Sequence, residues 1–191
     1  MKVIIMQTRS SPGRRMFVAI DLPAPLTRRL ADVVPAARGV KRVQPATMHL
    51  TLHFLGDVPE ALLPALTAAL DHVKAAPFTL ELASRGRFPA RGPARVLWMG
   101  VADSPALAEV HAAVGRGIES VGLPPEGRPF TPHVTLARLT DAAGRRIPEG
   151  FLAGGPIRNA AFPVERITLY ESERTPDGPV HTPVHEVRLG A

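Results

Sequence analysis

Two short motifs in this chain of 191 residues place an imidazole and a hydroxyl two positions apart. One reads His49-Leu50-Thr51-Leu52, and the other reads His133-Val134-Thr135-Leu136. With the His and Thr content of this chain, chance predicts roughly 0.1 copies of a His-x-Thr-aliphatic pattern. Two copies therefore indicate that the pattern has a function.

The spacing determines which side chains lie together. In a β-strand, residues i and i+2 point to one face and residues i+1 and i+3 to the other. Each motif would thus bury its aliphatic residues and present His and Thr together on the opposite face. A hydroxyl can hold a phosphate oxygen, and an imidazole can transfer a proton near neutral pH. Two such faces lining one cleft would supply an acid and a base for in-line cleavage of a phosphodiester.

The sequence favours a reaction without a cofactor or metal. The chain has no cysteine, which excludes a disulfide scaffold, a thiolate nucleophile and cysteine-ligated zinc or iron–sulfur sites. It also lacks the carboxylate-rich spacing that a two-metal nuclease requires. Metal binding by the two histidines is a weaker alternative, because no third ligand lies at a defined spacing.

The elements around the motifs are expected to repeat. Strands are predicted near 16–22, 48–55, 78–82, 95–101, 133–139, 163–171 and 183–189, and helices over 23–37, 60–75 and 104–121. A buried strand, a helix and a strand beginning His-x-Thr-Leu occur in each half of the chain. The predicted class is α+β: a duplicated bilobal fold with two mainly antiparallel sheets, related by a pseudo-twofold around a central cleft, and helices on the outer faces.

Composition sets the wider expectations. Residues 1–15 lack periodicity and indicate a loose basic tail, and residues 16–191 are expected to form a single bilobal domain. No apolar run approaches the roughly 18 residues of a membrane helix, which favours a cytoplasmic protein, and we expect a monomer. The net charge is +6, and lysine occurs only as Lys2, Lys41 and Lys74. An arginine-rich chain suits a phosphate-bearing partner, although a high-GC genome would also favour arginine.

An ordered set of segments resembles a known family, the LigT-like RNA 2',3'-cyclic phosphodiesterases, also called 2'-5' RNA ligases, of the two-histidine phosphoesterase superfamily. Besides the two motifs, the segments are Met16-Phe17-Val18-Ala19-Ile20-Asp21-Leu22-Pro23, Phe54-Leu55-Gly56, Gly86-Arg87-Phe88-Pro89, Val96-Leu97-Trp98 and the run from Arg128 to Arg138. The resemblance extends from Arg15 to the C-terminus.

The resemblance implies a function and roles for the motif residues. It implies hydrolysis of an RNA 2',3'-cyclic phosphate end to a 2'-phosphate, with RNA as the partner. His49 would protonate the departing 3' oxygen, His133 would activate water, and Thr51 and Thr135 would bind the phosphate. The reverse assignment of acid and base stays open. The resemblance also implies that 2'-5' linkages can be joined or split reversibly.

Further residues have two readings each. Arg138 matches a family arginine at the phosphate, but a regular strand would turn it away from His133, so a bulge or a strand end is required. His53 is expected on the face of Thr51, as a rim or RNA-binding residue. Phe130 either stacks a terminal base or packs internally. Arg128 and the loop arginines form either an RNA track or a solvated basic surface; the loop arginines are Arg85, Arg87, Arg91 and Arg95.

The remaining ring residues are given structural roles. Trp98 is expected in the core because it alternates within an apolar strand. His72 and His111 are expected at helix surfaces. His181 and His185 are interpreted as structural, although His181 could border the cleft.

Two other functions remain open from the sequence. The same chemistry could act on 2'-5' linked oligonucleotides or on small cyclic nucleotides. Alternatively, the chain could be a non-catalytic module that binds RNA ends, in which the histidines only contact phosphate. Turnover separates the enzymes from the binding module.

Overall fold

The computed structural model describes residues 13–124, 126–141, 144–155, 157–176 and 178–190. Its strands are β1 (Arg14–Asp21), β2 (Val40–Arg42), β3 (His49–Val58), β4 (Phe78–Phe88), β5 (Val96–Val101), β6 (His133–Leu139), β7 (Ala161–Val164), β8 (Arg166–Thr175) and β9 (Gly178–Arg188). Its α-helices are α1 (Ala24–Ala31), α2 (Leu63–Asp71) and α3 (Pro105–Ser120), with 3₁₀ turns η1 (Pro45–Thr47) and η2 (Glu60–Leu62).

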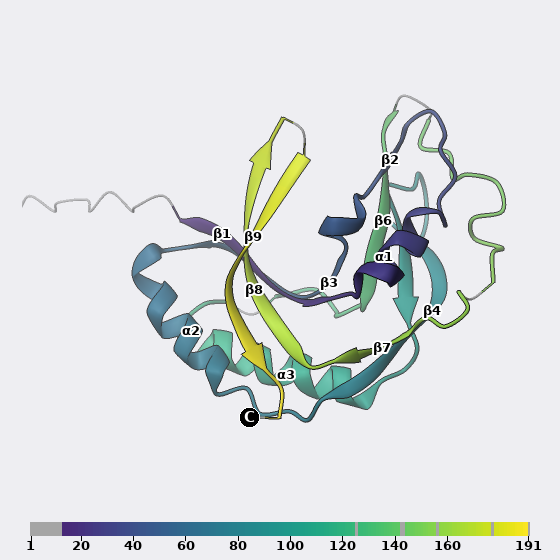
Figure 1. The fold of residues 1–191 in the computed structure, drawn as a ribbon. Helices are drawn as coiled ribbons and strands as arrows, with labels where there is room; N and C mark the ends of the chain where they lie inside the picture. The colour runs from purple at the N-terminus through teal and green to yellow at the C-terminus, as the bar shows by residue number, and fades with distance from the viewer. Residues whose placement is uncertain (1–12, 125, 142–143, 156, 177, 191) are drawn as a thin grey trace, which may run out of the picture.

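The strands form one antiparallel sheet in the order β7-β4-β5-β6-β3-β1-β8-β9, and β2 pairs with β6. The expected α+β class with antiparallel pairing is confirmed. The expected division into two sheets is wrong, because Leu50 of β3 pairs with Val134 of β6 and joins the two groups of strands. The single sheet curls strongly, with the β8–β9 hairpin rising on one side and β2 and β6 on the other (Figure 1).

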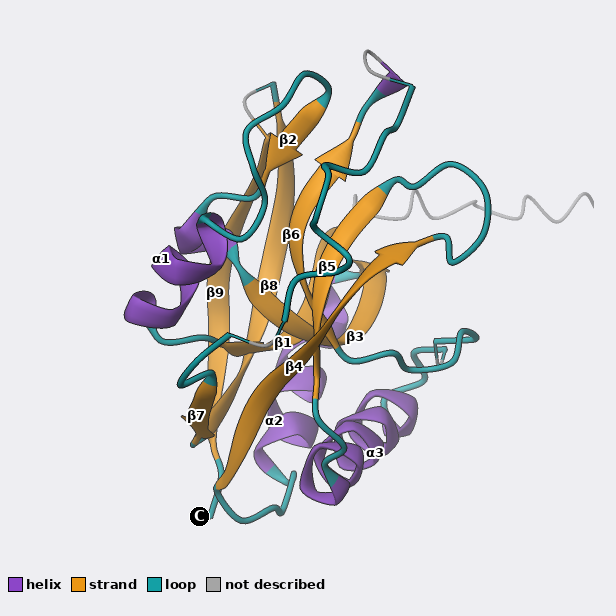
Figure 2. Ribbon diagram, turned by 90° about the vertical axis from the view of Figure 1, so that its right-hand side faces the viewer, coloured by secondary structure: helices purple, strands orange, loops and turns teal. Residues whose placement is uncertain are grey.

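Helices α2 and α3 lie side by side against one face of this sheet (Figures 1 and 2). Helix α3 begins where the Ser104 side chain accepts a hydrogen bond from the Leu107 backbone amide, with Pro105 in the first turn. Its apolar stripe is buried against the sheet and consists of Leu107, Val110, Val114 and Ile118. The same core contains the aliphatic residues of both His-x-Thr motifs. The opposite face of the central strands is therefore available for chemistry.

Several element boundaries differ from the predictions. Helix α1 ends at Ala31 and not near residue 37, because Pro35 disfavours helical geometry at the residue before it. Strand β4 continues to Phe88 through the predicted loop, since Phe88 pairs with Val96 of β5. The strand predicted at 163–171 is two strands, β7 and β8, on either side of Glu165.

The first strand begins inside the segment predicted to be a tail. Strand β1 begins at Arg14, two residues before the expected domain start. The Arg14 side chain forms an ion pair with the Glu171 side chain of β8. Residues 1–12 of the expected tail lie outside the described residues. Among the residues that the structure describes, no helix is long and apolar enough to cross a membrane.

Candidate active site

The site is centred on the β3–β6 pair. Leu50 and Val134 lie opposite each other in this pair, and both are fully buried under the helices. Continuing the antiparallel register by one residue in each direction sets His49 opposite Thr135 and Thr51 opposite His133. Directly opposite residues share a face. All four side chains of the motifs therefore meet on the face of the sheet away from α2 and α3, which we call the open face.

Both histidines are held in the same tautomer. The Nδ1 of His49 lies 2.9 Å from the Thr47 carbonyl oxygen, and the Nδ1 of His133 lies 2.7 Å from the Thr131 carbonyl oxygen. Since a carbonyl only accepts, each Nδ1 must be the donor and carry the proton. The Nε2 of each neutral ring is then left with a free lone pair. Each imidazole is thus prepared to accept a proton at Nε2, or to donate one from Nε2 once it is protonated.

Aromatic rings pack around His49. Phe17 stacks on the His49 ring with centroids 4.8 Å apart, and Tyr170 stacks on Phe17 at 5.3 Å while lying 6.4 Å from His49. The His181 ring meets His49 edge-on at 5.2 Å. Asp21, paired with His49 across β1 and β3, accepts hydrogen bonds from Tyr170 Oη at 2.7 Å and Thr168 Oγ1 at 2.9 Å. This packing fixes the orientation of the His49 ring.

A second aromatic wall borders His133. Phe88 meets the His133 ring edge-on at 4.9 Å, and the Trp98 centroid lies 6.1 Å from it. Trp98 pairs with Thr135 and lies on the open face, so the prediction that it belongs to the core is wrong. A Cβ on Gly86 would lie 2.1 Å from the indole, and glycine there allows the ring to lie against strand β4.

A bulge in β6 brings Arg138 to the open face. Trp98 pairs with Thr135, whereas the next residue back, Leu97, pairs with Ala137, so β6 contains one extra residue at Leu136. This restores Arg138 to the side of His133, as the sequence required for a phosphate contact. The positive charge of Arg138 lowers the pKa of both His133 and His181.

A matching bulge in β3 has the opposite effect on His53. Val18 pairs with His53 and Ala19 with Thr51, so the extra residue at Leu52 turns His53 toward the helices. His53 is buried, its Nε2 lies 2.8 Å from the His111 carbonyl oxygen, and its ring stacks on His111 at 4.1 Å. The expectation that His53 shares a face with Thr51 is wrong.

The other expected RNA-binding residues make contacts within the protein. Phe130 stacks on His111 at 3.9 Å, which agrees with internal packing. Arg128 is bound to Glu126. Arg85 donates to the Phe151 carbonyl, and Arg87 donates to the Ala90 and Gly92 carbonyls, so these two side chains hold loops.

Burial dominates the electrostatics of the two motif histidines. Desolvation lowers the pKa of His49 to about 4, against the smaller opposing effects of the Thr47 carbonyl and the Asp21 carboxylate. Desolvation and then Arg138 lower the pKa of His133, against the Thr131 carbonyl. The imidazoles of His181 and His133 also lower the pKa of His49, by smaller amounts than burial. At neutral pH both rings are therefore neutral in this structure.

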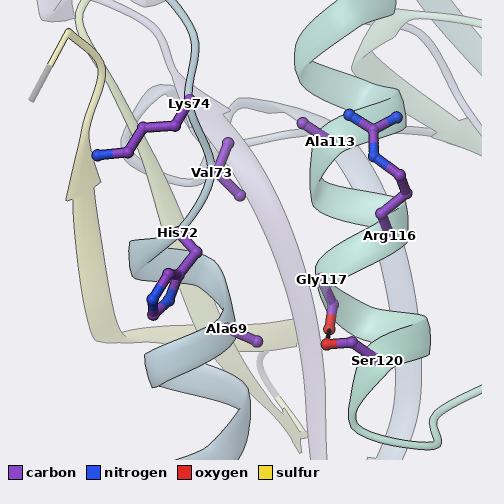
Figure 3. A pocket seen from close by; sticks show the side chains of 8 residues that line it. All are labelled: Ala69, His72, Val73, Lys74, Ala113, Arg116, Gly117 and Ser120. Atoms are coloured by element: carbon purple, nitrogen blue, oxygen red, sulfur yellow. Dashed lines mark hydrogen bonds between the residues drawn. The ribbon is translucent and has the colours of Figure 1, made fainter.

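One pocket of the molecule lies away from these groups. A pocket between α2 and α3 lies on the helix side and is lined by His72, Lys74, Arg116, Ser120 and small residues (Figure 3). Within the described part of the chain, no cluster of three or more His, Asp or Glu residues could hold a metal ion.

Comparison with known proteins decides the family. The model for the 2'-5' RNA ligase superfamily matches residues 22–176. The chain belongs to this superfamily. The expected family relationship is therefore confirmed, and the matched region includes both His-x-Thr motifs.

Individual superfamily members resemble the chain over most of its length. An RNA 2',3'-cyclic phosphodiesterase of Thermus thermophilus is 36% identical over 187 residues, covering 92% of this chain and 90% of the relative. The enzyme of that name from Escherichia coli is 32% identical over 167 residues, covering 85% and 89%. The crystal structure of E. coli LigT in apo form matches with a TM-score of 0.78 and 30% identity, over 95% of this chain and 100% of that one.

Sequence reasoning missed several neighbours of the motif histidines, namely Phe17, Asp21, Phe88 and Tyr170. Phe17 and Asp21 sit at alternating positions of β1, but the run from Met16 to Leu22 was interpreted only as a buried strand. The alternation of Phe17, Ala19 and Asp21 is the signal that sequence offers for these neighbours. It places an aromatic ring and a carboxylate on one face of the strand, opposite the buried Val18.

Proposed function

We propose that this protein is a metal-independent RNA 2',3'-cyclic phosphodiesterase that leaves a 2'-phosphate end. The observation that carries the proposal is the antiparallel pairing of Leu50 with Val134, because it sets the two His-x-Thr motifs beside each other on one face. The activity named for the relatives agrees with that arrangement. Two imidazoles and two hydroxyls around one phosphorus atom supply a base, an acid and two phosphate ligands without a metal.

The proposed reaction is a single in-line displacement. The Nε2 of His133 takes a proton from water as the water oxygen attacks phosphorus, and the bond from phosphorus to the 3' oxygen breaks. The protonated Nε2 of His49 delivers its proton to that oxygen, which leaves as a 3'-hydroxyl. Thr51 and Thr135 donate hydrogen bonds to the nonbridging oxygens, and Arg138 balances their charge. The products are a 2'-phosphate monoester and a protonated His133.

Neighbouring charges favour this division of roles. The Asp21 carboxylate raises the pKa of His49, whereas the Arg138 guanidinium lowers the pKa of His133. A bound phosphate anion raises the pKa of any adjacent imidazole. Burial lowers the pKa of His49 to about 4, so the phosphate must offset this effect before His49, beside Asp21, holds the proton. His133 beside Arg138 is the ring that stays neutral as the base.

The proposal also includes the duplicated, bilobal origin of the site. Two antiparallel strands are related locally by a twofold axis, and here that axis passes between the two motifs. The bulges at Leu52 and Leu136 support the duplication, because each follows its motif threonine by one residue. The pairs β1–β3 and β5–β6 are then corresponding halves of one cleft.

A turnover experiment tests the function. The protein is incubated in EDTA with cytidine 2',3'-cyclic phosphate and with a short RNA that ends in a 2',3'-cyclic phosphate, and the product is identified by ³¹P NMR. We expect a 2'-phosphate product, and we expect His49→Ala and His133→Ala each to lower turnover by about 100-fold or more. His72→Ala is the matched control, since His72 lies on the helix side and bonds only the Ala68 carbonyl.

The outcomes separate the alternatives. A 3'-phosphate product, or normal turnover in both active-site variants, would contradict the mechanism. Salt-sensitive RNA binding without any turnover would favour the non-catalytic module. Faster cleavage of 2'-5' linked oligonucleotides than of cyclic phosphates would change the substrate but keep the chemistry.

A further inference from the structure

A third imidazole, that of His181, borders the open face. His181 lies in β9 and pairs with Ser172 of β8. Its ring meets His49 at 5.2 Å with an interplanar angle of 88°, and it meets Phe17 at 4.9 Å with an angle of 79°. It is therefore packed edge-on against the candidate general acid His49 and against Phe17, which stacks on it, and it belongs to the same side of the site.

The two nitrogens of His181 have different surroundings. Nδ1 is buried and has no hydrogen-bond partner among the described residues. Nε2 is not among the buried unpaired atoms and makes no hydrogen bond within the described chain, so it is accessible to solvent. A buried unpaired N–H is rarer and less tolerated than a buried unpaired acceptor. The proton of neutral His181 thus belongs on Nε2, where water or a ligand can accept a hydrogen bond.

This tautomer is the reverse of that of the two motif histidines. His49 and His133 give their Nδ1 protons to backbone carbonyls and present lone pairs at Nε2. His181 presents an N–H donor instead, so the ring is suited to hold an anionic oxygen and not to act as a base. Burial and the nearby Arg138 charge keep the ring neutral, since both lower its pKa.

Charge interactions place His181 beside the expected position of the phosphate. His181 acts on His49, and Arg138 acts on both His133 and His181. The four side chains of His49, His133, His181 and Arg138 therefore form one group. Within it, each side chain interacts electrostatically with two of the others. Thr51 and Thr135 lie on β3 and β6, the two strands that carry His49 and His133. We therefore expect an oxygen held by the threonines to lie within reach of His181.

We propose that His181 is a substrate-binding residue that donates a hydrogen bond from Nε2–H to a nonbridging oxygen of the substrate phosphate. It keeps its proton through the reaction. The inference rests on the proposed function of the site, which it extends by a third neutral donor beside the two threonines.

A matched pair of variants tests the donor. His181→Phe keeps an aromatic ring against Phe17 and His49 but removes the N–H, whereas His181→Tyr keeps the ring and supplies an O–H. We expect His181→Phe to raise both the KM for cytidine 2',3'-cyclic phosphate and the inhibition constant of inorganic phosphate by about 10-fold, as for loss of a hydrogen bond to a charged group. His181→Tyr should recover a large part of both. Equal constants for wild type and His181→Phe would overturn the inference, and so would equal losses in the two variants.

Histidine NMR gives a second readout that needs neither turnover nor a variant. Long-range ¹H–¹⁵N correlations of the ¹⁵N-histidine-labelled protein report the tautomer of each ring. We expect His181 protonated on Nε2, His49 and His133 protonated on Nδ1, and a shift of the His181 Nε2–H resonance when inorganic phosphate is added. An Nδ1–H tautomer of His181, or no response to phosphate, would overturn the inference.

The two proposals fail in different ways. If wild type cleaves no cyclic phosphate while phosphate still shifts the His181 resonance, the proposed function fails and the binding role stands. If wild type is fully active and His181→Phe has unchanged constants, the binding role fails and the proposed function stands.

Discussion

His49 and His133 make the same local hydrogen bond, but their charged neighbours differ. Each donates Nδ1–H to the carbonyl two residues before it, at 2.9 Å for His49 and 2.7 Å for His133. His49 lies by Asp21, whereas His133 lies by Arg138. The backbone thus sets which nitrogen reacts, and the flanking charges favour His49 as the acid and His133 as the base in the proposed reaction. Opposing environments of this kind are how two similar groups divide acid and base roles.

The lowered pKa values predict an acid optimum for kcat/KM. The active free enzyme needs one charged and one neutral imidazole, and that state is most populated between their two pKa values. His49 lies at about 4 and His133 below its usual 6.5, so kcat/KM for cytidine 2',3'-cyclic phosphate should peak between these values and fall toward higher pH. The alkaline limb of kcat should lie at higher pH, since bound phosphate raises both pKa values. A flat kcat/KM profile from about pH 5 to about pH 8 would contradict this assignment.

The sequence was sufficient for the motif residues but not for their neighbours. The His-x-Thr spacing predicts a shared face within each strand, and this holds for His49, Thr51, His133 and Thr135 because they precede the bulges. His53 and Arg138 follow the bulges, so strict alternation assigns the wrong face to both. A bulge depends on pairing with another strand, and pairing is not visible in one segment of sequence.

At the scale of elements, a three-residue strand extends the open face. Strand β2 was not predicted, because Val40–Arg42 is too short to show a periodic pattern. Its Lys41 lies opposite Arg138 of β6, and directly opposite residues in an antiparallel pair share a face. The bulge at Leu136 that turns Arg138 toward the phosphate therefore brings Lys41 to the same side. The exposed lysine adds positive charge beyond the reacting phosphate, where the RNA chain would continue.

This placement predicts a length-dependent effect of Lys41. Lys41→Gln should weaken binding of a cyclic-phosphate oligonucleotide and reduce the slope of log affinity against log salt by about 0.7, the value for one phosphate contact on a single strand. The KM for cytidine 2',3'-cyclic phosphate, which lacks that second phosphate, should stay the same. Lys74→Gln is the matched control, because it makes the same change of net charge at the helix-side pocket. Equal slopes for Lys41→Gln and wild type would contradict an RNA contact at β2.

At the scale of the whole molecule, the two faces of one sheet have different roles: one forms the core and the other carries the candidate site. One face packs on α2 and α3 (Figure 1). The other presents imidazoles, hydroxyls and aromatic rings. The repeat of strand and helix predicted the α+β class and the helix-covered core. It could not predict that β3 and β6 would pair, since the motifs lie far apart in the chain and a single ladder contact joins them. That contact converts the expected pair of sheets into one curved sheet.

Placing neutral imidazoles in this partly buried site has a cost to stability at low pH. The pKa of His49 is about 4 in the fold and near 6.5 in the unfolded chain, so the unfolded state binds more protons between these values. Stability is therefore complete above about pH 6.5 and falls as the pH is lowered toward 4, by on the order of 3 kcal/mol for His49 alone. His111, His133 and His181 shift in the same direction and add to the fall.

Urea unfolding of wild type and His49→Asn from about pH 7 to about pH 4 isolates this contribution from that of the carboxylates, which titrate in both proteins. The free energy of unfolding of His49→Asn should fall less steeply than that of wild type, because asparagine takes up no proton. His72→Ala should follow wild type, since His72 is exposed on α2's end. Parallel curves for wild type and His49→Asn would mean that His49 is not held neutral by burial. The low pKa used above for the acid optimum would then be wrong as well, so this one measurement bears on both the fold and the catalytic proposal.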